Sequence, residues 1–249
     1  MDRSAVITFS GQLRDARENA LRDSEAFDDI IYVVERLGSF LDNKILDLGS
    51  YRTKIEIEAS QSALAKDIPD QWPDVHIPFS LLYELVRNAR NDALHQGAFA
   101  RRLAGHAIEL SLVLEDALRR SLDSPVVSDY MVRNPTCAEL WQPISFIRHQ
   151  MLANSFSFLP VKSATEWCLV SDSEIASYLG TNTKERKLRL AQRLDVARIP
   201  LRPAKLCAVD TPLDEALSML DGSPRPLLVC RKEGEEQSLV GIITPFDLL

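Results

Sequence analysis

Apolar positions in the first half of the chain recur three and four residues apart, which is the spacing of an amphipathic helix. One such stripe runs through residues 12–40, and Ser10 is a candidate N-cap for it. The same spacing predicts helices over residues 51–66, 80–93 and 99–122, whereas prolines predict a loop over 68–78. Amphipathic helices joined by short connections are typical of an antiparallel helical bundle.

Beyond about residue 122 the pattern changes to short apolar runs that alternate with helical segments. Strands are predicted over 158–161, 167–170, 227–230 and 239–243, with helices over 138–153 and 214–220 between them. Such alternation is typical of α/β modules. The predicted fold class is therefore multidomain, with an N-terminal all-α helical bundle and a C-terminal α/β module.

The second half also repeats itself. The first copy comprises residues 127–136, a helix, and then 159–161 and 169–175. The second comprises residues 208–216, 226–229 and 241–249. An internal repeat of this kind indicates two modules that share one architecture.

The second copy ends in Gly241-Ile242-Ile243-Thr244-x-x-Asp247, and with this ending the repeat resembles the CBS domain family, whose tandem copies form a Bateman module. The resemblance implies that the hydroxyl and the carboxylate of this ending hold the ribose of a nucleotide. A carboxylate can accept from two vicinal hydroxyls, and a helix N-terminus favours phosphate. Thr244 and Asp247 are therefore the candidate ligand-binding residues of the second copy, with Thr211 as a further candidate.

Ser171 and Glu174 fall at the matching positions of the first copy. This copy departs from the family pattern, because Cys168 replaces a glycine and Glu174 replaces an aspartate. We therefore expect one well-formed site and one weaker or empty site for a regulatory adenine nucleotide (AMP, ADP or ATP). The alternative is that both copies serve only as a dimerisation scaffold.

The first half contains Arg90-Asn91-Asp92-Ala93-Leu94-His95 near the end of a predicted helix. At roughly 100° per residue, Asn91 and His95 share a face, whereas Arg90 and His95 do not stack directly. The segment resembles the R-N-x-x-x-H motif of HEPN domains, helical bundles that often act as metal-independent ribonucleases. The resemblance implies a homodimer in which two copies of this helix form one pocket.

RNA cleavage of this kind needs a deprotonated 2′-hydroxyl and a stabilised phosphorane. His95 is suited to general acid–base catalysis, Arg90 to phosphate contact, and Asn91 to orienting the phosphate or His95. The expected product carries a 2′,3′-cyclic phosphate, with no catalytic cofactor and no metal. The alternative is that Arg90 forms a surface ion pair and that His95 lies at a helix C-terminus, where a cation is favourable.

Composition changes this picture little. Hydrophobic residues make up 45% of the 249 residues and charged residues 26%, which is typical of a globular protein. The sequence shows no signal peptide and no apolar run near the ~18–20 residues of a membrane span, so a cytoplasmic protein is expected. A net charge of −7 argues against a protein that coats nucleic acid. The four cysteines form no C-x-x-C pair, and we interpret them as buried thiols.

The sequence thus predicts a HEPN-like bundle over residues 1–122, a first CBS motif over 124–180, a basic linker over 181–199 and a second CBS motif over 200–249. The predicted function is a nucleotide-regulated, metal-independent endoribonuclease that acts on RNA as a homodimer. A toxin or defence role with an antitoxin partner is compatible with it, and neither DNA nor a membrane is an expected partner. The alternative is a non-catalytic nucleotide-sensing regulator whose helical domain binds a protein or RNA.

Overall fold

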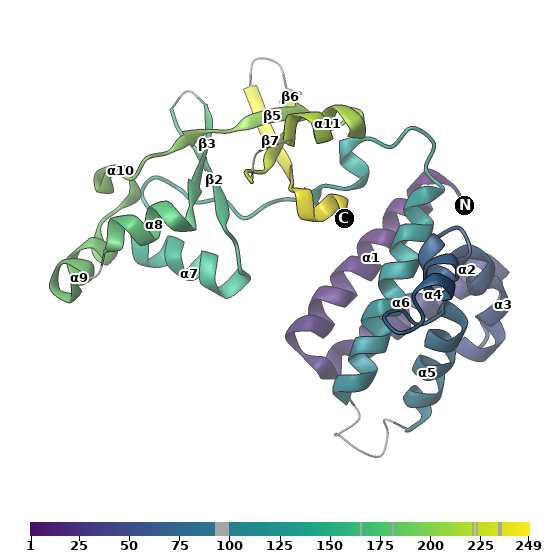
Figure 1. Cartoon of the computed structure of the whole chain (residues 1–249). Helices are drawn as coiled ribbons and strands as arrows, with labels where there is room; N and C mark the ends of the chain where they lie inside the picture. Colours follow the sequence, from purple (N-terminus) through teal and green to yellow (C-terminus); the bar gives the residue numbers. More distant parts are fainter. Residues whose placement is uncertain (93–99, 165, 181, 221, 223, 234–235) are drawn as a thin grey trace. The chain divides into compact units, whose positions relative to one another are not determined.

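A computed structural model of the chain describes all residues except 93–99, 165, 181, 221, 223 and 234–235 (Figure 1). The chain divides into two compact units, Met1–Asp123 and Ser124–Leu249. The first unit is helical and the second contains both helices and sheets, as the change of hydrophobic pattern predicts.

The first unit is built from amphipathic helices around one apolar core. Buried side chains from the long helices fill that core, among them Leu13, Leu37, Ile55, Leu82 and Leu114. The helices are α1 (Arg3–Arg22), α2 (Phe27–Asp42), α3 (Leu48–Ala59), α4 (Asp67–Gln71), α5 (Phe79–Asp92) and α6 (Ala100–Arg120), with 3-10 turns η1 (Ser24–Ala26) and η2 (Ala63–Ala65).

The single helix predicted over residues 12–40 is wrong, because the segment forms α1 and α2 with a break between them. Helix α1 begins at Arg3, where the side chain of Asp2 accepts a hydrogen bond from Ala5 N at 2.7 Å. Ser10 is therefore not an N-cap but lies buried inside α1. The break comes at Asp23, whose extended backbone lets its carboxylate cap η1 through Glu25 N at 3.0 Å.

Helix α3 also differs from the prediction, since it starts at Leu48 and ends at Ala59 rather than spanning residues 51–66. Asp47 caps its start by accepting from Ser50 N at 2.8 Å. Helices α2 and α3 pack closely where Gly38 meets Tyr51, since a Cβ at residue 38 would lie 2.4 Å from the Tyr51 Cγ. The predicted loop over residues 68–78 contains part of the short helix α4.

The described part of the second unit contains two sheets. The four-stranded sheet has the order β1-β7-β6-β5 and the three-stranded sheet the order β2-β3-β4. The strands are β1 (Val132–Arg133), β2 (Phe158–Lys162), β3 (Trp167–Ser171), β4 (Arg202–Pro203), β5 (Lys205–Ala208), β6 (Leu227–Glu233) and β7 (Glu236–Ile243). The helices and 3-10 turns are η3 (Val127–Asp129), α7 (Ile144–Asn154), α8 (Asp172–Leu179), α9 (Thr183–Ala191), α10 (Leu194–Ala197), α11 (Leu213–Leu220) and η4 (Pro245–Leu248).

Both copies of the repeat have the same connectivity: a helix, an antiparallel strand pair and a second helical segment. The first copy is α7-β2-β3-α8 and the second is α11-β6-β7-η4. Helix α7 starts later than the predicted residue 138, because Ala138 instead forms a parallel bridge with Val161. Each copy has its own apolar core, so the repeat seen in the sequence is a repeat of packing units.

The two copies exchange their leading segments. Strand β1 precedes the first copy in the chain but pairs with β7 of the second, and β4 precedes the second copy but pairs with β3 of the first. The exchange includes matching backbone hydrogen bonds, from Val127 N to the carbonyl of Thr211 at 2.9 Å and from Leu194 N to that of Gln142 at 3.0 Å. The two copies therefore form one interlocked unit.

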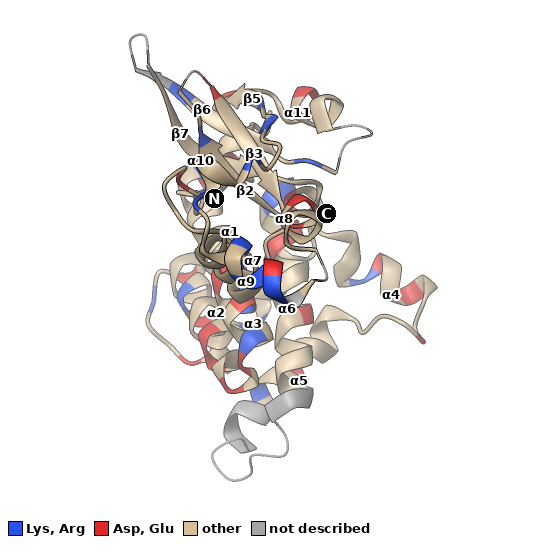
Figure 2. Cartoon of the chain, turned by 90° about the vertical axis from the view of Figure 1, so that its left-hand side faces the viewer, with Lys and Arg blue, Asp and Glu red and all other residues tan. Residues whose placement is uncertain are grey.

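The segment expected as a basic linker, residues 181–199, contains α9 and α10. Charged side chains are spread along the described helices of both units, and α9 carries several basic ones (Figure 2). Leu194, Ala197 and Ile199 are buried in the core of the first copy. The end of this segment is thus part of the first copy's packing.

Candidate functional site

Thr244 and Asp247 lie together where β7 ends and η4 begins. The Oδ2 atom of Asp247 accepts from both the backbone N and the Oγ1 of Thr244, each at 2.8 Å. In return, Asp247 N donates to the carbonyl of Thr244 at 3.1 Å. The two predicted residues form a capping box, which fixes the orientation of the buried Asp247 carboxylate.

Ser171 and Glu174 form the equivalent box where β3 ends and α8 begins. Glu174 Oε2 accepts from Ser171 N at 3.1 Å and from Ser171 Oγ at 2.9 Å, and Glu174 N donates to that Oγ at 3.2 Å. The extra methylene of glutamate carries the second oxygen further, and Oε1 accepts from Arg202 Nε at 2.6 Å. The repeated motif in the sequence thus corresponds, in both copies, to a hydroxyl and a carboxylate that lie side by side.

The ion pair with Arg202 changes the acidity of Glu174. Burial by itself would raise the pKa of this carboxyl, since it disfavours the charged form. The hydrogen bonds from Arg202 and from Ser171, together with the charge of Arg202, outweigh that effect and lower the pKa. Glu174 is therefore ionised at neutral pH, with both of its oxygens engaged.

Thr211, the further candidate, stabilises the turn between β5 and α11. Its Oγ1 accepts from Ala208 N at 3.0 Å. In the first copy the side chain of Gln142 has the matching task, since its Oε1 accepts from Glu139 N at 3.0 Å. The observed role of the Thr211 side chain is thus a local one.

Gly241 and Cys168 occupy equivalent positions, three residues before Thr244 and Ser171 respectively. A Cβ at residue 241 would lie 2.3 Å from the Sδ of Met131 and 3.2 Å from the carbonyl oxygen of Val132. Glycine is needed there because Met131 and the β1 backbone come so close. Cys168 is buried in the first copy, and this burial is the main reason why its pKa is raised.

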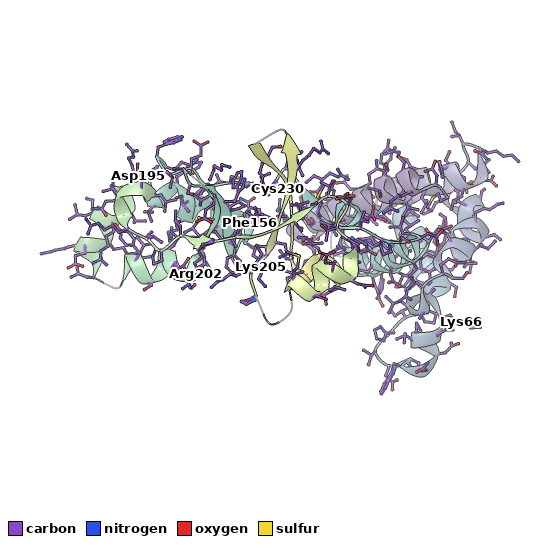
Figure 3. The ribbon with its side chains drawn as sticks, turned by 90° about the horizontal axis from the view of Figure 1, so that it is seen from above. Lys66, Phe156, Asp195, Arg202, Lys205 and Cys230 are labelled. Carbon is purple, nitrogen blue, oxygen red and sulfur yellow. The ribbon has the colours of Figure 1, made fainter. Side chains whose placement is uncertain are left out.

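Arg202 is a residue of the site that the sequence alone did not single out. It lies on β4, the edge strand of the first copy's sheet, and is labelled in Figure 3. Its side chain is about half exposed, whereas that of Glu174 is largely buried. The available signal was its place just before the second copy, but only the strand exchange brings it to the first copy's carboxylate.

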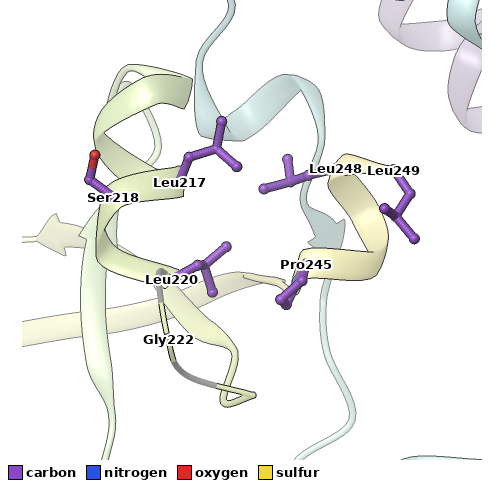
Figure 4. Close-up of a pocket in the computed structure, with 7 residues that line it drawn as sticks. All are labelled: Leu217, Ser218, Leu220, Gly222, Pro245, Leu248 and Leu249. Carbon is purple, nitrogen blue, oxygen red and sulfur yellow. The ribbon is translucent and has the colours of Figure 1, made fainter.

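An open apolar pocket of about 730 Å³ lies between α11 and η4 (Figure 4). Leucine side chains dominate its lining, and Pro245 joins it directly after Thr244. Its lining residues are Leu217, Ser218, Leu220, Gly222, Pro245, Leu248 and Leu249. Such a surface can take an apolar group, and it adjoins the second copy's capping box through Pro245.

The predicted catalytic motif is only partly within the described structure. Helix α5 ends at Asp92, so Arg90 and Asn91 belong to its last turn, and α6 begins at Ala100. His95 and the side chains of Arg90 and Asn91 lie outside the described residues. Of the neighbouring basic residues, Arg87 forms an ion pair with Glu84 at 2.6 Å.

Three further features bear on function: the thiols, the potential metal ligands and the apolar helices. Cys137, Cys168, Cys207 and Cys230 are all free thiols. Within the described residues, no group of three or more His, Cys, Asp and Glu side chains is arranged to hold a metal ion. No helix in the described part of the chain is both long and apolar enough to span a membrane.

No protein-family model matches the sequence, and no curated protein matches it. Among solved structures, about half of the chain is similar to CBS-domain proteins. A CBS domain-containing protein of unknown function from Bacillus anthracis str. Ames Ancestor has 14% identity over 52% of this chain and 94% of its own, with a TM-score of 0.41. AcuB from Vibrio cholerae, a candidate acetoin utilization protein, has 22% identity over 51% of this chain and 88% of its own, with a TM-score of 0.40. CBSX2, whose structure is a complex with AMP, has 19% identity over 49% of this chain and 92% of its own, with a TM-score of 0.38.

Proposed function

We propose that residues 124–249 form a tandem CBS module that binds a regulatory adenine nucleotide. The observation that carries the proposal is the capping box of the second copy, in which the carboxylate of Asp247 and the hydroxyl of Thr244 are held together at a strand end. A carboxylate that is already oriented recognises vicinal hydroxyls without a further ordering cost. The AMP in the CBSX2 structure makes adenine nucleotides the first ligands to test.

Calorimetric titration of the full chain with AMP, ADP and ATP tests this proposal. We expect at least one of these nucleotides to bind, and Asp247→Ala to weaken its binding by roughly 10–100-fold, since a hydrogen bond to a charged group contributes about 1.5–3 kcal/mol. Asp247→Asn keeps an acceptor for Thr244 N and so controls for loss of the box. Asp210→Ala removes the same charge from an exposed position in the same copy and should leave binding unchanged.

Two results would contradict the proposal. Absence of binding heat with all three nucleotides would remove the ligand class. Unchanged affinity in both Asp247 variants would remove the site assignment, even if a nucleotide binds elsewhere on the unit.

We further propose that the helical unit is a HEPN-like, metal-independent endoribonuclease, active as a homodimer, and that the nucleotide shifts the population of active dimers. The observation that favours it is the position of Arg90 and Asn91 in the last turn of α5, ahead of a connection to the amphipathic helix α6. Regulation would need a difference in nucleotide affinity between the active and inactive dimers. By analogy with HEPN ribonucleases, this activity would be compatible with a toxin or defence role and an antitoxin partner.

Incubation with a mixed single-stranded RNA tests the enzyme proposal. The wild type should cut the RNA and leave 2′,3′-cyclic phosphate ends, and His95→Ala and Arg90→Ala should each lose the activity. His76→Ala removes a histidine from the loop before α5 and serves as the matched control. If the wild type cuts no better than the two variants, with and without adenine nucleotide, the non-catalytic regulator replaces the ribonuclease.

A further inference from the structure

Positive charge is concentrated in the segment 182–198, which contains α9 and α10 (Figure 2). The chain as a whole has a net charge of −7, so the rest of the chain is more negative than the total. A polyanion is therefore attracted more by this segment than by the chain on average. The cationic residues of the segment are Lys184, Arg186, Lys187, Arg189, Arg193 and Arg198, and the acidic ones are Glu185 and Asp195.

Both acidic side chains of the segment are neutralised within it. Arg189 Nη2 donates to Glu185 Oε2 at 2.9 Å, one helical turn away on α9. Arg193 forms an ion pair with Asp195. Neither carboxylate is therefore left to repel a phosphate that approaches the other cations.

Two of the arginines also fasten α9 to the end of α8. Arg186 Nη1 donates to the carbonyl of Gly180 at 2.9 Å, and Arg189 Nη1 donates to that of Tyr178 at 2.7 Å. Helix α9 needs these bonds because it has no fully buried residue. The helix is thus held in place mainly through its arginines, while its lysines remain on the surface.

Three cations of the segment are left without a partner among the described residues. The side chains of Lys184, Lys187 and Arg198 are exposed and form no hydrogen bond or ion pair within the described part of the chain. Lys184 and Lys187 are three residues apart and so share a face of α9. These three cations can contact an anion without first breaking an internal ion pair.

The composition of this surface favours a nucleic acid over a protein as its partner. Among the described side chains of the segment, only Leu188 and Val196 are large, apolar and exposed. A specific protein interface buries about 800 Å² on each partner and has an apolar core in which lysine is depleted. A phosphate backbone needs only cations that can reach it.

We infer that the segment 182–198 binds the phosphate backbone of RNA through Lys184, Lys187 and Arg198. The inference rests on RNA as the proposed substrate and adds a docking surface for it on the second unit. Contacts with phosphates carry no sequence information, so this surface raises the affinity for RNA of any sequence. Binding of this kind releases counterions and therefore weakens steeply as the salt concentration rises.

Fluorescence anisotropy of a labelled, 2′-O-methylated single-stranded RNA tests the inference. This RNA lacks the free 2′-hydroxyl that the proposed cleavage needs, so the wild-type full chain can be titrated without loss of the ligand. The triple variant Lys184→Ala, Lys187→Ala and Arg198→Ala should bind roughly 10-fold more weakly at low salt. The slope of log affinity against log salt should become shallower by about 2, since each contact with a single strand contributes about 0.7.

The matched control removes the same charge from the helical unit. Lys44, Lys54 and Lys66 are likewise exposed, without a hydrogen bond or ion pair from their side chains to other described residues. Replacement of all three by alanine should leave both the affinity and the salt slope close to those of the wild type. An equal loss in this control would assign the effect to net charge and overturn the inference.

The other outcomes separate the docking surface from the enzyme proposal. Unchanged RNA affinity and salt slope in the segment's triple variant would overturn the docking surface, even if the wild type cleaves RNA. Binding that depends on the three cations, without cleavage of unmodified RNA, would support the surface and overturn the enzyme. Equally tight binding of poly-glutamate would make this a surface for acidic protein segments and would overturn the choice of RNA.

Discussion

The two copies of the C-terminal unit share a topology and a strand register, yet they differ around the capping box, and three of the differences change its chemistry. The first copy has Cys168, Glu174 and Arg202 where the second has Gly241, Asp247 and Val132. In the first copy Ser171 and Arg202 both donate to the carboxylate of Glu174, and in the second Thr244 donates to that of Asp247. One backbone arrangement can thus support a structural ion pair in one copy and a candidate ligand site in the other.

The copies also differ in the length of the helical segment that each box caps. Ser171 starts α8, which has 8 residues, whereas Thr244 starts η4, which has 4. A longer helix has more backbone N–H groups and apolar contacts that depend on its cap. The first box is therefore expected to matter more for folding and the second more for binding.

The exchanged segments should show the largest effect on stability. Leu194 is buried in the first copy's core, although it follows α9 in the chain. We expect Leu194→Ala to lower the free energy of unfolding by about 2–4 kcal/mol, because a large buried side chain leaves a cavity. Urea unfolding followed by the fluorescence of Trp141 and Trp167 measures it.

The control for that experiment is Leu188→Ala on α9, where the side chain is 72% exposed. This change should stay within about 0.5 kcal/mol of the wild type. Equal effects of the two substitutions would mean that the exchanged segment does not carry the first copy's core.

Gly241→Ala in the second copy should lower the free energy of unfolding more than Cys168→Ala does in the first. Gly241→Ala brings a Cβ against Met131 and the β1 backbone and should cost about 1–3 kcal/mol of unfolding free energy. Cys168→Ala removes only a small buried group and should cost about 1 kcal/mol or less. The same urea titration compares the two variants.

Met131→Ala in the Gly241→Ala background tests the cause. If the clash with Met131 is responsible, the double variant should recover part of the loss, with a coupling energy of about 0.5–2 kcal/mol. Additive effects of the two changes would assign the cost to the β1 backbone instead.

Loss of the capping hydroxyls should give a smaller difference in unfolding free energy between the two copies. Ser171→Ala should lower the free energy of unfolding by about 1 kcal/mol, since Ser171 caps a full helix. Thr244→Ala should cost less, because η4 is a single short turn. A larger loss for Thr244→Ala would reverse the assignment of the two boxes to folding and binding.

The smallest expected effect is the pH dependence of the first copy's ion pair. Because the folded-state pKa of Glu174 is lowered, the pair stabilises the fold above the ordinary pKa of 4.5, and this contribution is lost as the pH falls through the folded-state value. Arg202 is half exposed, so the contribution should be only about 0.5–1 kcal/mol. Unfolding of the wild type and Arg202→Gln should therefore differ at neutral pH and converge in acid, whereas a constant difference would point to packing rather than charge.

The pattern of apolar residues predicted a helical first unit and an α/β second unit, the boundary near residue 122 and the internal repeat of the second unit, because each depends on local spacing. It did not show the break at Asp23, where the cap of a short turn prevails over an unbroken apolar stripe. The resemblance of the repeat to the CBS family, rather than periodicity, indicated both hydroxyl–carboxylate pairs, whose members lie three residues apart in sequence. It could not find Arg202, which lies 28 residues from Glu174 and reaches it only through β4.

The exchange of β1 and β4 has a consequence for any attempt to divide the protein. A cut at residue 199 would separate the two repeats in sequence but would leave the first fragment without β4, and the second without β1 and the core residues Val127 and Met131. The smallest fragment expected to fold is the whole of residues 124–249, and two pieces cut at that point should recover the fold only when mixed. Neither repeat is therefore expected to fold when it is transferred to another protein by itself.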